Sequence, residues 1–364
     1  MTEIRLADCG ADGSTGPQAM PGGGRMIACA TPRGQSKTVG NLRYLEKLRE
    51  RLQLPDDVGD PAAHARFPLR VPTAFLDRIP PGKADDPLLR QILPVSEELL
   101  SLPGFGPDPV DDEMAMVVPG VLSKYAGRAL LIVTGACAIH CRYCFRREFP
   151  YEDANAASDQ WSGALRQLQS DTSVREVILS GGDPLSLSDE KLTHLVEQLD
   201  AIPHLQRLRL HTRWPVVAPK RVGESLLAWL GATRLKTALV VHVNHPQELD
   251  AHTAHALRQL SGVGVCLLNQ SVLLRGVNDA ADVLVDLSET LFAQGVLPYY
   301  LHQLDRAAGT AHFEVSDRKA LRLYTALQRR LPGYLVPRLV RETAGAPCKL
   351  PLDAVCIRGI QSNR

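Results

Sequence analysis

The sequence predicts an α/β fold, a partial (β/α)6 TIM-like barrel with an N-terminal helical cap. After residue 121, short apolar runs rich in β-branched residues alternate with amphipathic stretches of helical spacing. Six strand-helix repeats in succession favour a parallel sheet with helices on one side, connected by right-handed crossovers. A full eight-fold barrel and an open doubly wound sheet are the competing architectures.

The repeats begin with an apolar run that directly precedes a group of cysteines. The expected strands are 129–134, 174–180, 205–211, 237–243, 263–269 and 297–301. The expected helices are 159–169, 189–199, 222–230, 248–260, 281–293 and 316–331. In barrels of parallel strands, ligands bind at the carboxyl ends of the strands. The polar residues that follow these strands are therefore the first candidates for a functional site.

Composition divides the chain into three expected parts. Residues 1–25 are rich in Gly, Pro, Asp and Ala and bury too little apolar surface to become ordered, so a disordered leader is expected. Residues 26–120 are expected to form the helical cap, which begins with leucines at helical spacing between 42 and 52. Residues 121–364 are expected to form the barrel and a C-terminal segment that carries a lysine.

Charge and cysteine content exclude several classes of protein. The formal net charge of +1 provides no general field that would attract nucleic acid or a membrane surface. No apolar run approaches the roughly 18 residues of a membrane span, and the N-terminus lacks the apolar core of a signal peptide. The eight cysteines do not follow a disulfide pattern, which is typical of a reducing compartment. A cytoplasmic protein is expected.

Three cysteines follow the first expected strand with the spacing C-x3-C-x2-C. Cys137, Cys141 and Cys144 lie on one loop and together suit a 4Fe-4S cluster, whose fourth iron then has no protein ligand. An open iron can bind S-adenosylmethionine, which is then reduced and split into a carbon radical. The loop resembles that of the radical S-adenosylmethionine enzymes, in which an aromatic such as Tyr143 lies near the adenine ring. A zinc site would need a fourth ligand, and no second cysteine pair follows.

Polar residues also follow the later strands. The second strand ends in Ser180, Gly181, Gly182 and Asp183, where glycines would let the backbone approach the amino group of S-adenosylmethionine. A tight structural turn explains these glycines equally well. The third, fourth and fifth strands end in 211–213, 242–245 and 269–271, and they supply Arg213, His242 and Gln270.

A lysine near the C-terminus suggests a second cofactor. Lys349 follows a turn of small residues after the extended run 334–341. Its amine would form a Schiff base with pyridoxal phosphate if an apolar setting keeps part of it deprotonated. A lone lysine after a turn is also explained as a solvated surface residue.

From about residue 67 onward, the chain resembles the lysine 2,3-aminomutase family of radical S-adenosylmethionine enzymes. Within the family it is most similar to the branch that makes (R)-β-lysine for the modification of translation elongation factor P. The motifs are DDPLLRQ at 85–91, VVPGVLSKY at 117–125, CAIHCRYCFRREFPY at 137–151, SGGDPL at 180–185, LLNQSVLLRGVND at 267–279, PYYLHQLD at 298–305 and GYLVPRLVRE at 333–342.

The resemblance implies a role for each matching position. The three cysteines would bind the cluster, and Lys349 would bind pyridoxal phosphate covalently. The remaining cofactor-binding candidates are Lys124 and Arg128 for the phosphate group, His242 and Gln270 near S-adenosylmethionine, and Tyr143, Ser180, Gly181, Gly182, Asp183 and Arg213. Arg146 would pair with the substrate carboxylate through its planar fork. Asp305 and Glu342 would receive the distal ammonium of lysine.

Glu342 departs from the aspartate that metabolic aminomutases usually carry, and this departure agrees with the elongation-factor branch. The chain also ends at Arg364, without the C-terminal cysteine group of the longer metabolic enzymes, so their mode of assembly is not carried over to this chain.

The resemblance therefore implies an isomerase that converts L-lysine to (R)-β-lysine by 1,2-amino migration. Its implied partners are an electron donor such as flavodoxin or ferredoxin, and a functional link to elongation factor P and its lysyl ligase. A metabolic lysine 2,3-aminomutase that makes (S)-β-lysine is the first alternative. A glutamate 2,3-aminomutase is disfavoured, because Asp305 would repel a second carboxylate. A non-catalytic metal-binding interaction module is the alternative from another class.

Overall fold

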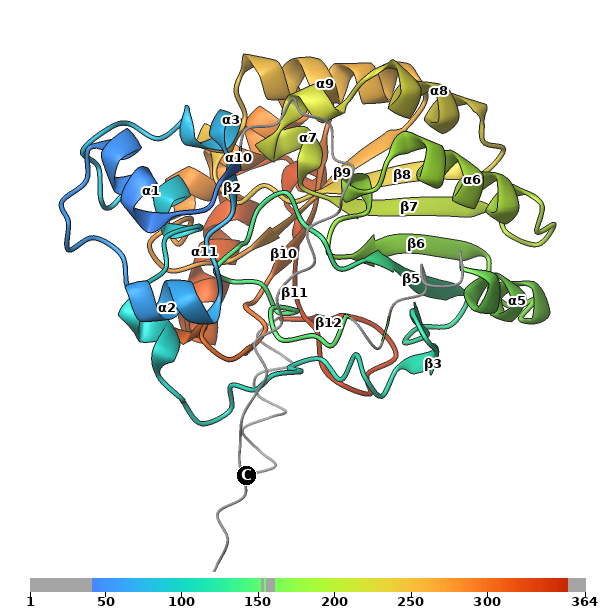
Figure 1. Ribbon diagram of the computed structural model, residues 1–364, viewed down its shortest axis with the longest axis horizontal. Helices are drawn as coiled ribbons and strands as arrows, with labels where there is room; N and C mark the ends of the chain where they lie inside the picture. The colour runs from blue at the N-terminus through green and yellow to red at the C-terminus, as the bar shows by residue number, and fades with distance from the viewer. Residues whose placement is uncertain (1–40, 152–153, 155–160, 353–364) are drawn as a thin grey trace, which may run out of the picture.

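The computed structural model describes residues 41–151, 154 and 161–352. The expected leader and the first part of the expected cap lie outside these residues, as does Cys356. Within the described part of the chain, a ten-stranded sheet forms the body of the protein, in the order β12-β11-β10-β9-β8-β7-β6-β5-β4-β3 (Figure 1).

The centre of the sheet is a run of parallel strands that follow one another in chain order. They are β5 (Arg128–Thr134), β6 (Glu176–Gly181), β7 (Arg207–Thr212), β8 (Lys236–Val241), β9 (Cys266–Val272), β10 (Leu297–His302) and β11 (Arg338–Arg341). The six strands expected from the sequence are all present, shifted by up to three residues. The extended run 334–341 adds β11 to the parallel set as a further strand. This strand was missed because it is short and no helix follows it in the described residues.

The sheet ends in antiparallel strands on both sides. β3 (Met116–Val118) and β4 (Val121–Leu122) pair next to β5, and β12 (Leu350–Pro351) pairs with β11. Among the described residues, β3 and β12 each pair with one neighbour, so the sheet does not close on itself. The prediction of an α/β fold with a partial barrel is confirmed, and the closed eight-fold barrel is excluded by this topology.

The crossover helices return the chain from one strand to the next. They are α5 (Ser162–Ser170), α6 (Asp189–Asp200), α8 (Glu224–Ala232), α9 (Ala251–Gly262), α10 (Ala281–Ala293) and α11 (Asp317–Arg330), with the short α7 (Trp214–Val217) after β7. Side chains cap several of them: Ser188 accepts from the Lys191 amide at 3.4 Å and Asp250 from the Thr253 amide at 2.7 Å. In Figure 1, α6, α8 and α9 run along the outside of β7 and β8. Their buried leucine faces join the core that covers this side of the sheet.

The N-terminal segment folds as short helices around a two-stranded ribbon. β1 (Asn41–Leu42) pairs with β2 (Val71–Pro72), and the helices are α1 (Leu45–Leu52), α2 (Pro61–Arg66), α3 (Thr73–Leu76) and α4 (Pro87–Arg90). Leu48, Phe75 and Leu88 from this segment lie in the same apolar core as the barrel leucines Leu179 and Leu210. The cap is therefore packed directly against the barrel, and the boundary at residue 120 stays a prediction.

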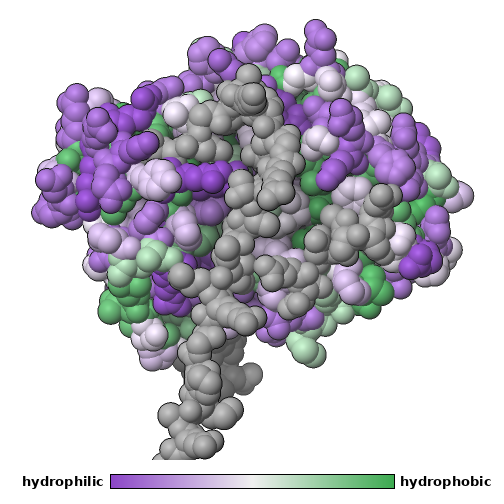
Figure 2. All heavy atoms as spheres, viewed as in Figure 1, coloured by the Kyte–Doolittle hydropathy of each residue, from purple (hydrophilic) through white to green (hydrophobic). Residues whose placement is uncertain are grey.

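Two further features concern the surface. On the face shown in Figure 2, hydrophilic residues surround scattered apolar ones. None of the helices in the described ranges combines the length and apolar character that crossing a membrane requires.

Candidate active site

A cavity of about 1240 Å³ is lined by every residue that the sequence analysis singled out for a site. The lining residues come from the N-terminal segment, from β5 to β7 and β9 to β11, from the loops that follow β5 to β8, and from the segment that leads into β12. Arg128 begins β5 and the cysteine loop follows its end, so the cavity extends along a seven-residue strand, roughly 20 Å. Arg128 therefore lies toward one end of this space and the cysteines toward the other.

The cysteine loop is anchored by backbone and side-chain contacts to the N-terminal segment. The His140 amide donates to the Arg70 carbonyl and the Arg142 amide donates to the Gln91 carbonyl, both at 2.9 Å. Cys137, Cys141 and Cys144 are each partly buried, and none of them forms a disulfide. Burial raises the pKa of the Cys144 thiol to about 11. Within the described ranges, no three His, Cys, Asp or Glu side chains converge on a single metal ion. The three cysteines of a 4Fe-4S cluster each bind a different iron, and three thiols on one loop, none of them in a disulfide, fit that donor set.

Glu98 accepts hydrogen bonds from two arginines of the cysteine loop, and the sequence did not predict this role. Its carboxylate accepts from Arg142 Nε at 2.8 Å and from Arg147 NH2 at 2.8 Å. Both guanidinium groups also lie over the ring of Phe67, at 4.7 and 4.6 Å from its centroid. Glu98 stands in the Pro- and Asp-rich stretch 67–112, which has no recognisable spacing, so only the tertiary contact reveals it.

The glycines after β6 are explained by close packing on the start of the cysteine loop. Gly182 donates its amide to the Thr134 carbonyl at 2.7 Å, and a Cβ on Gly182 would overlap the Ala136 carbonyl. Gly181 has φ +116°, and a Cβ there would lie 2.6 Å from the Thr134 oxygen. The tight-turn explanation therefore accounts for both glycines, and binding of S-adenosylmethionine by this turn stays a prediction.

Asp183 ties the ends of two strands together. Its Oδ1 accepts from Thr212 Oγ1 at 2.7 Å and from the Leu185 amide at 3.1 Å, and its Oδ2 accepts from the Arg213 amide at 2.7 Å. Burial raises the pKa of this carboxyl to about 6. Both oxygens are used within the protein, so the side chain shapes the site through the positions of β6 and β7.

Arg213 connects the cysteine loop to a buried polar network. Its NH1 donates to Cys141 Sγ at 2.9 Å and to Tyr143 Oη at 2.8 Å. Its NH2 donates to Glu248 Oε2 at 2.7 Å, which compensates the buried charge. A guanidinium that donates to a thiolate ligand is one of the groups that set the potential of an iron-sulfur cluster.

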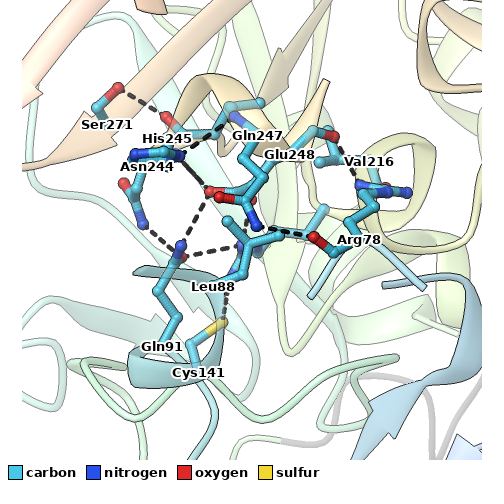
Figure 3. Close-up of polar contacts among 12 residues, drawn as sticks. Arg78, Leu88, Gln91, Cys141, Val216, Asn244, His245, Gln247, Glu248 and Ser271 are labelled. Atoms are coloured by element: carbon cyan, nitrogen blue, oxygen red, sulfur yellow. Dashed lines mark hydrogen bonds and ion pairs between the residues drawn. The ribbon is translucent and has the colours of Figure 1, made fainter. Parts of the chain in front are cut away.

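Gln91 of the N-terminal segment occupies the centre of this network. Figure 3 shows Gln91, Asn244 and Glu248 pointing toward one another. Gln91 Nε2 donates to Glu248 Oε1 at 3.1 Å, and Gln91 Oε1 accepts from Asn244 Nδ2 at 3.0 Å. Asn244 Nδ2 also donates to Tyr143 Oη at 2.7 Å. All three amide and carboxylate side chains are fully buried, so the network positions the cysteine loop against β7 and β8.

A chain of alternating charges runs along another wall of the cavity. Arg146 Nε donates to Asp112 Oδ2 at 2.6 Å, and Lys124 Nζ lies 2.6 Å from Asp112 Oδ1. Lys124 Nζ also donates to Glu342 Oε1 at 3.3 Å, and Glu342 Oε2 accepts from Lys349 Nζ. Burial alone would raise the pKa of Asp112 and of Glu342, but these cations hold both below their ordinary values. Asp112 was not predicted, since no motif distinguishes it from the other acidic residues around it.

Asp305 differs from these carboxylates because it has no such partner. Within the described residues no side chain donates a hydrogen bond to it, and burial together with the charge of Glu342 raises its pKa to about 7. It therefore faces the cavity as a carboxylate that a cation would stabilise.

Neutral imidazoles also face the cavity. Burial lowers the pKa of His242 to about 3 and lowers those of His211 and His302 well below the ordinary value. His211 Nε2 and His302 Nε2 have no hydrogen-bond partner among the described residues. His302 ends β10 and was not singled out from the sequence. These ring nitrogens are available to a bound ligand.

Comparison with known proteins identifies relatives that match most of the chain. A family model described as a 4Fe-4S single cluster domain matches residues 125–208. The chain is 47% identical to a Haemophilus influenzae protein named L-lysine 2,3-aminomutase, over 83% of this chain and 90% of that one. It is 49% identical to the Escherichia coli protein of the same name, over 80% of this chain and 85% of that one. The protein of that name from Clostridium subterminale is 33% identical, over 85% of this chain and 75% of that one.

Among solved structures, the chain resembles a radical SAM methyltransferase from Sphaerobacter thermophilus. The TM-score is 0.42 and the identity 17%, over 64% of this chain and 73% of that one.

Proposed function

Since this chain belongs to the L-lysine 2,3-aminomutase family, we propose that it converts L-lysine to β-lysine by moving the amino group from Cα to Cβ. The observation that carries the proposal is the single cavity, in which three cysteines, a lysine amine and side chains of both charges face one another. Migration of an amino group from Cα to Cβ by a radical route needs a radical source and a group that holds the migrating nitrogen, and this set of side chains suits both.

The chain offers a separate group of ligands for each cofactor. We assign Cys137, Cys141 and Cys144 to the 4Fe-4S cluster, and His242 and Gln270 to S-adenosylmethionine. Lys349 would hold pyridoxal phosphate covalently, with Lys124 and Arg128 at its phosphate group. When bound, these three groups would supply the electron, the carbon radical and the ring that delocalises the unpaired electron.

Charged side chains of the cavity would hold the two ends of the substrate. Arg146 is assigned to the carboxylate of lysine, and Asp305 is assigned to the distal ammonium. The raised pKa of Asp305 supports this role, because a buried carboxylate without a partner gains most from an incoming cation. Asp305 would repel the second carboxylate of a substrate such as glutamate, so glutamate is disfavoured.

Glu342 has a more local role in the protein without ligands. It accepts from Lys349 Nζ and from Lys124 Nζ, and so it holds both ammonium groups at the cavity wall. Covalent attachment of a cofactor to Lys349 requires a neutral amine and removes this ion pair. Glu342 is then able to join Asp305 at the distal ammonium of the substrate.

We further propose that the product is (R)-β-lysine and that it is destined for elongation factor P. The glutamate at position 342, where the family resemblance implies aspartate in the metabolic enzymes, supports this branch. An electron donor such as flavodoxin or ferredoxin is proposed. The reducing cytoplasm is the proposed compartment, because thiolate ligands and the cluster persist there.

Anaerobic reconstitution tests the proposal. The chain is loaded with iron, sulfide and pyridoxal phosphate, then incubated with L-lysine, S-adenosylmethionine and a reductant, and the product is resolved by chiral chromatography. We expect (R)-β-lysine. The (S) isomer would assign the chain to metabolic use, and glutamate turnover would contradict the assignment of Asp305. A chain that binds zinc and gives no cluster spectrum would be a metal-binding module.

A further inference from the structure

We propose that Asp112, which belongs to the N-terminal segment, is a positioning residue of the active site that orients Arg146 toward the carboxylate of an α-amino acid. The inference rests on the proposed function and adds a residue that neither motif nor resemblance assigned. It makes the segment before the barrel a part of the substrate site.

The first step of the argument is the way Asp112 is held. The residue is 1% exposed, its amide donates to Asp108 Oδ1 at 2.9 Å, and its two carboxylate oxygens receive different cations. Arg146 Nε donates to Oδ2 and Lys124 Nζ lies beside Oδ1, both at 2.6 Å. A buried carboxylate between two cations fixes the distance between them, and its removal leaves two like charges uncompensated.

The second step concerns the donors that remain on Arg146. A guanidinium carries five N–H groups, of which Nε is taken by Asp112 and one on NH1 by Ser180 Oγ at 3.2 Å. The rings of Phe145 and Phe149 lie 4.8 and 6.0 Å from its carbon, so the plane is held as well. Because Asp112 occupies the Nε edge of the guanidinium, the substrate carboxylate binds at the opposite end of Arg146, where NH1 and NH2 both donate to it.

The third step concerns Lys124, the other cation on Asp112. Its Nζ also donates to the Val110 carbonyl at 2.6 Å and to Glu342 Oε1 at the longer distance of 3.3 Å. An anion that binds Lys124 therefore displaces Glu342 more readily than it displaces Asp112. Asp112 keeps its contact with both cations when the site fills, and the spacing of the two anion-binding groups is preserved.

The test compares two ligands that differ in the carboxylate. L-lysine and 1,5-diaminopentane both carry amines five carbons apart, but 1,5-diaminopentane offers nothing to Arg146. Their dissociation constants are measured by calorimetry on the fully loaded enzyme, anaerobically and without reductant, so that no turnover occurs. In Asp112→Asn, the side-chain NH2 replaces one of the two carboxylate oxygens and faces either Arg146 or Lys124. Because both groups are donors, the cation that faces the NH2 is displaced. We expect this variant to bind L-lysine about 10- to 100-fold more weakly and 1,5-diaminopentane nearly as the parent does.

Asp111→Asn is the matched control. Asp111 is the exposed neighbour with φ 52°, a conformation that Asn tolerates well, so the same change of charge beside the site leaves both affinities unchanged. Iron content and the circular dichroism spectrum show whether each variant is folded. If Asp112→Asn does not fold, Asp112→Glu is used in its place. The additional methylene moves the carboxylate by about 1.5 Å, and we expect it to lower the preference for L-lysine over 1,5-diaminopentane about threefold or more.

The outcomes separate the two proposals. Equal weakening of both ligands in Asp112→Asn, or unchanged or tighter binding of L-lysine, overturns the positioning role of Asp112. An unchanged preference in Asp112→Glu overturns it as well. A parent enzyme that binds neither ligand refutes the proposed function itself, whatever Asp112 does.

Discussion

Replacement of Asp305 by Asn probes a carboxylate to which no side chain donates a hydrogen bond in the part of the chain that the structure describes. Burial and the nearby charge of Glu342 raise the pKa of Asp305 to about 7, against an ordinary value of 3.8. Below about pH 4 the group is neutral in both the folded and the unfolded chain. Between pH 4 and 7 the folded chain keeps the proton and the unfolded chain loses it, so the stability contributed by protonation falls as the pH rises.

The magnitude follows from the shift. About three pKa units at 1.36 kcal/mol each set an upper limit of about 4 kcal/mol. Water in the cavity screens part of this penalty, so we expect Asp305→Asn to be more stable than the parent by about 2 to 4 kcal/mol at pH 8. For a chain of this length, that corresponds to a midpoint about 3 to 6 °C higher. Near pH 5 the difference should fall to about a third of its value at pH 8.

The assay is thermal unfolding of the cofactor-free chain between pH 5 and 8, with Asp111→Asn as an exposed control that should match the parent throughout. The reasoning is refuted if the difference between Asp305→Asn and the parent does not depend on pH, or if the variant is the less stable one at pH 8. The same variant should lose affinity for L-lysine, because the group that destabilises the empty cavity is the group assigned to the substrate cation.

Three other substitutions test separate parts of the site. Lys349→Ala should abolish the absorption band of covalently bound pyridoxal phosphate and leave the iron content unchanged; a persisting band would contradict the assignment. Gln91→Leu removes the hydrogen bonds that Gln91 makes to Glu248 and Asn244 in the core and should cost about 2 to 4 kcal/mol of stability together with bound iron, measured by thermal unfolding and iron analysis. Gly182→Ala should lower iron retention because its Cβ overlaps a carbonyl of the cysteine loop, whereas Gly223→Ala meets nothing within 4 Å; equal iron content in both would argue against that packing.

The barrel could be predicted because its strands and helices have different periods. The middle of β6 has three consecutive apolar residues at 177–179, since both faces of a parallel strand are buried, and the helices between the strands have one buried stripe. β11 escaped prediction because a four-residue strand depends on its neighbour β10 for its hydrogen bonds rather than on its own pattern. The cysteine loop was also readable, because ligands of one cluster lie close together in sequence.

The rest of the site could not be read in this way. Asp112, Gln91 and Glu98 lie in a stretch without periodicity, and each acts on a residue at least 30 positions away. In such a stretch, the sequence pattern around an acidic residue does not distinguish a solvated carboxylate from one that is buried between two cations. The turn after β6 shows the converse, because its glycines suggested a ligand and the structure explains them by contact with the cysteine loop.

The amino-acid sequence by itself determined the order of strands and helices and the three thiols on one loop, because both depend on neighbours along the chain. Tertiary structure alone decided that Asp112 joins Arg146 to Lys124, that Gln91 reaches Glu248, and that no side chain of the described residues donates a hydrogen bond to Asp305. These are properties of charges brought together across the fold, and the free energy of a buried charge depends on which groups surround it rather than on which residues precede it.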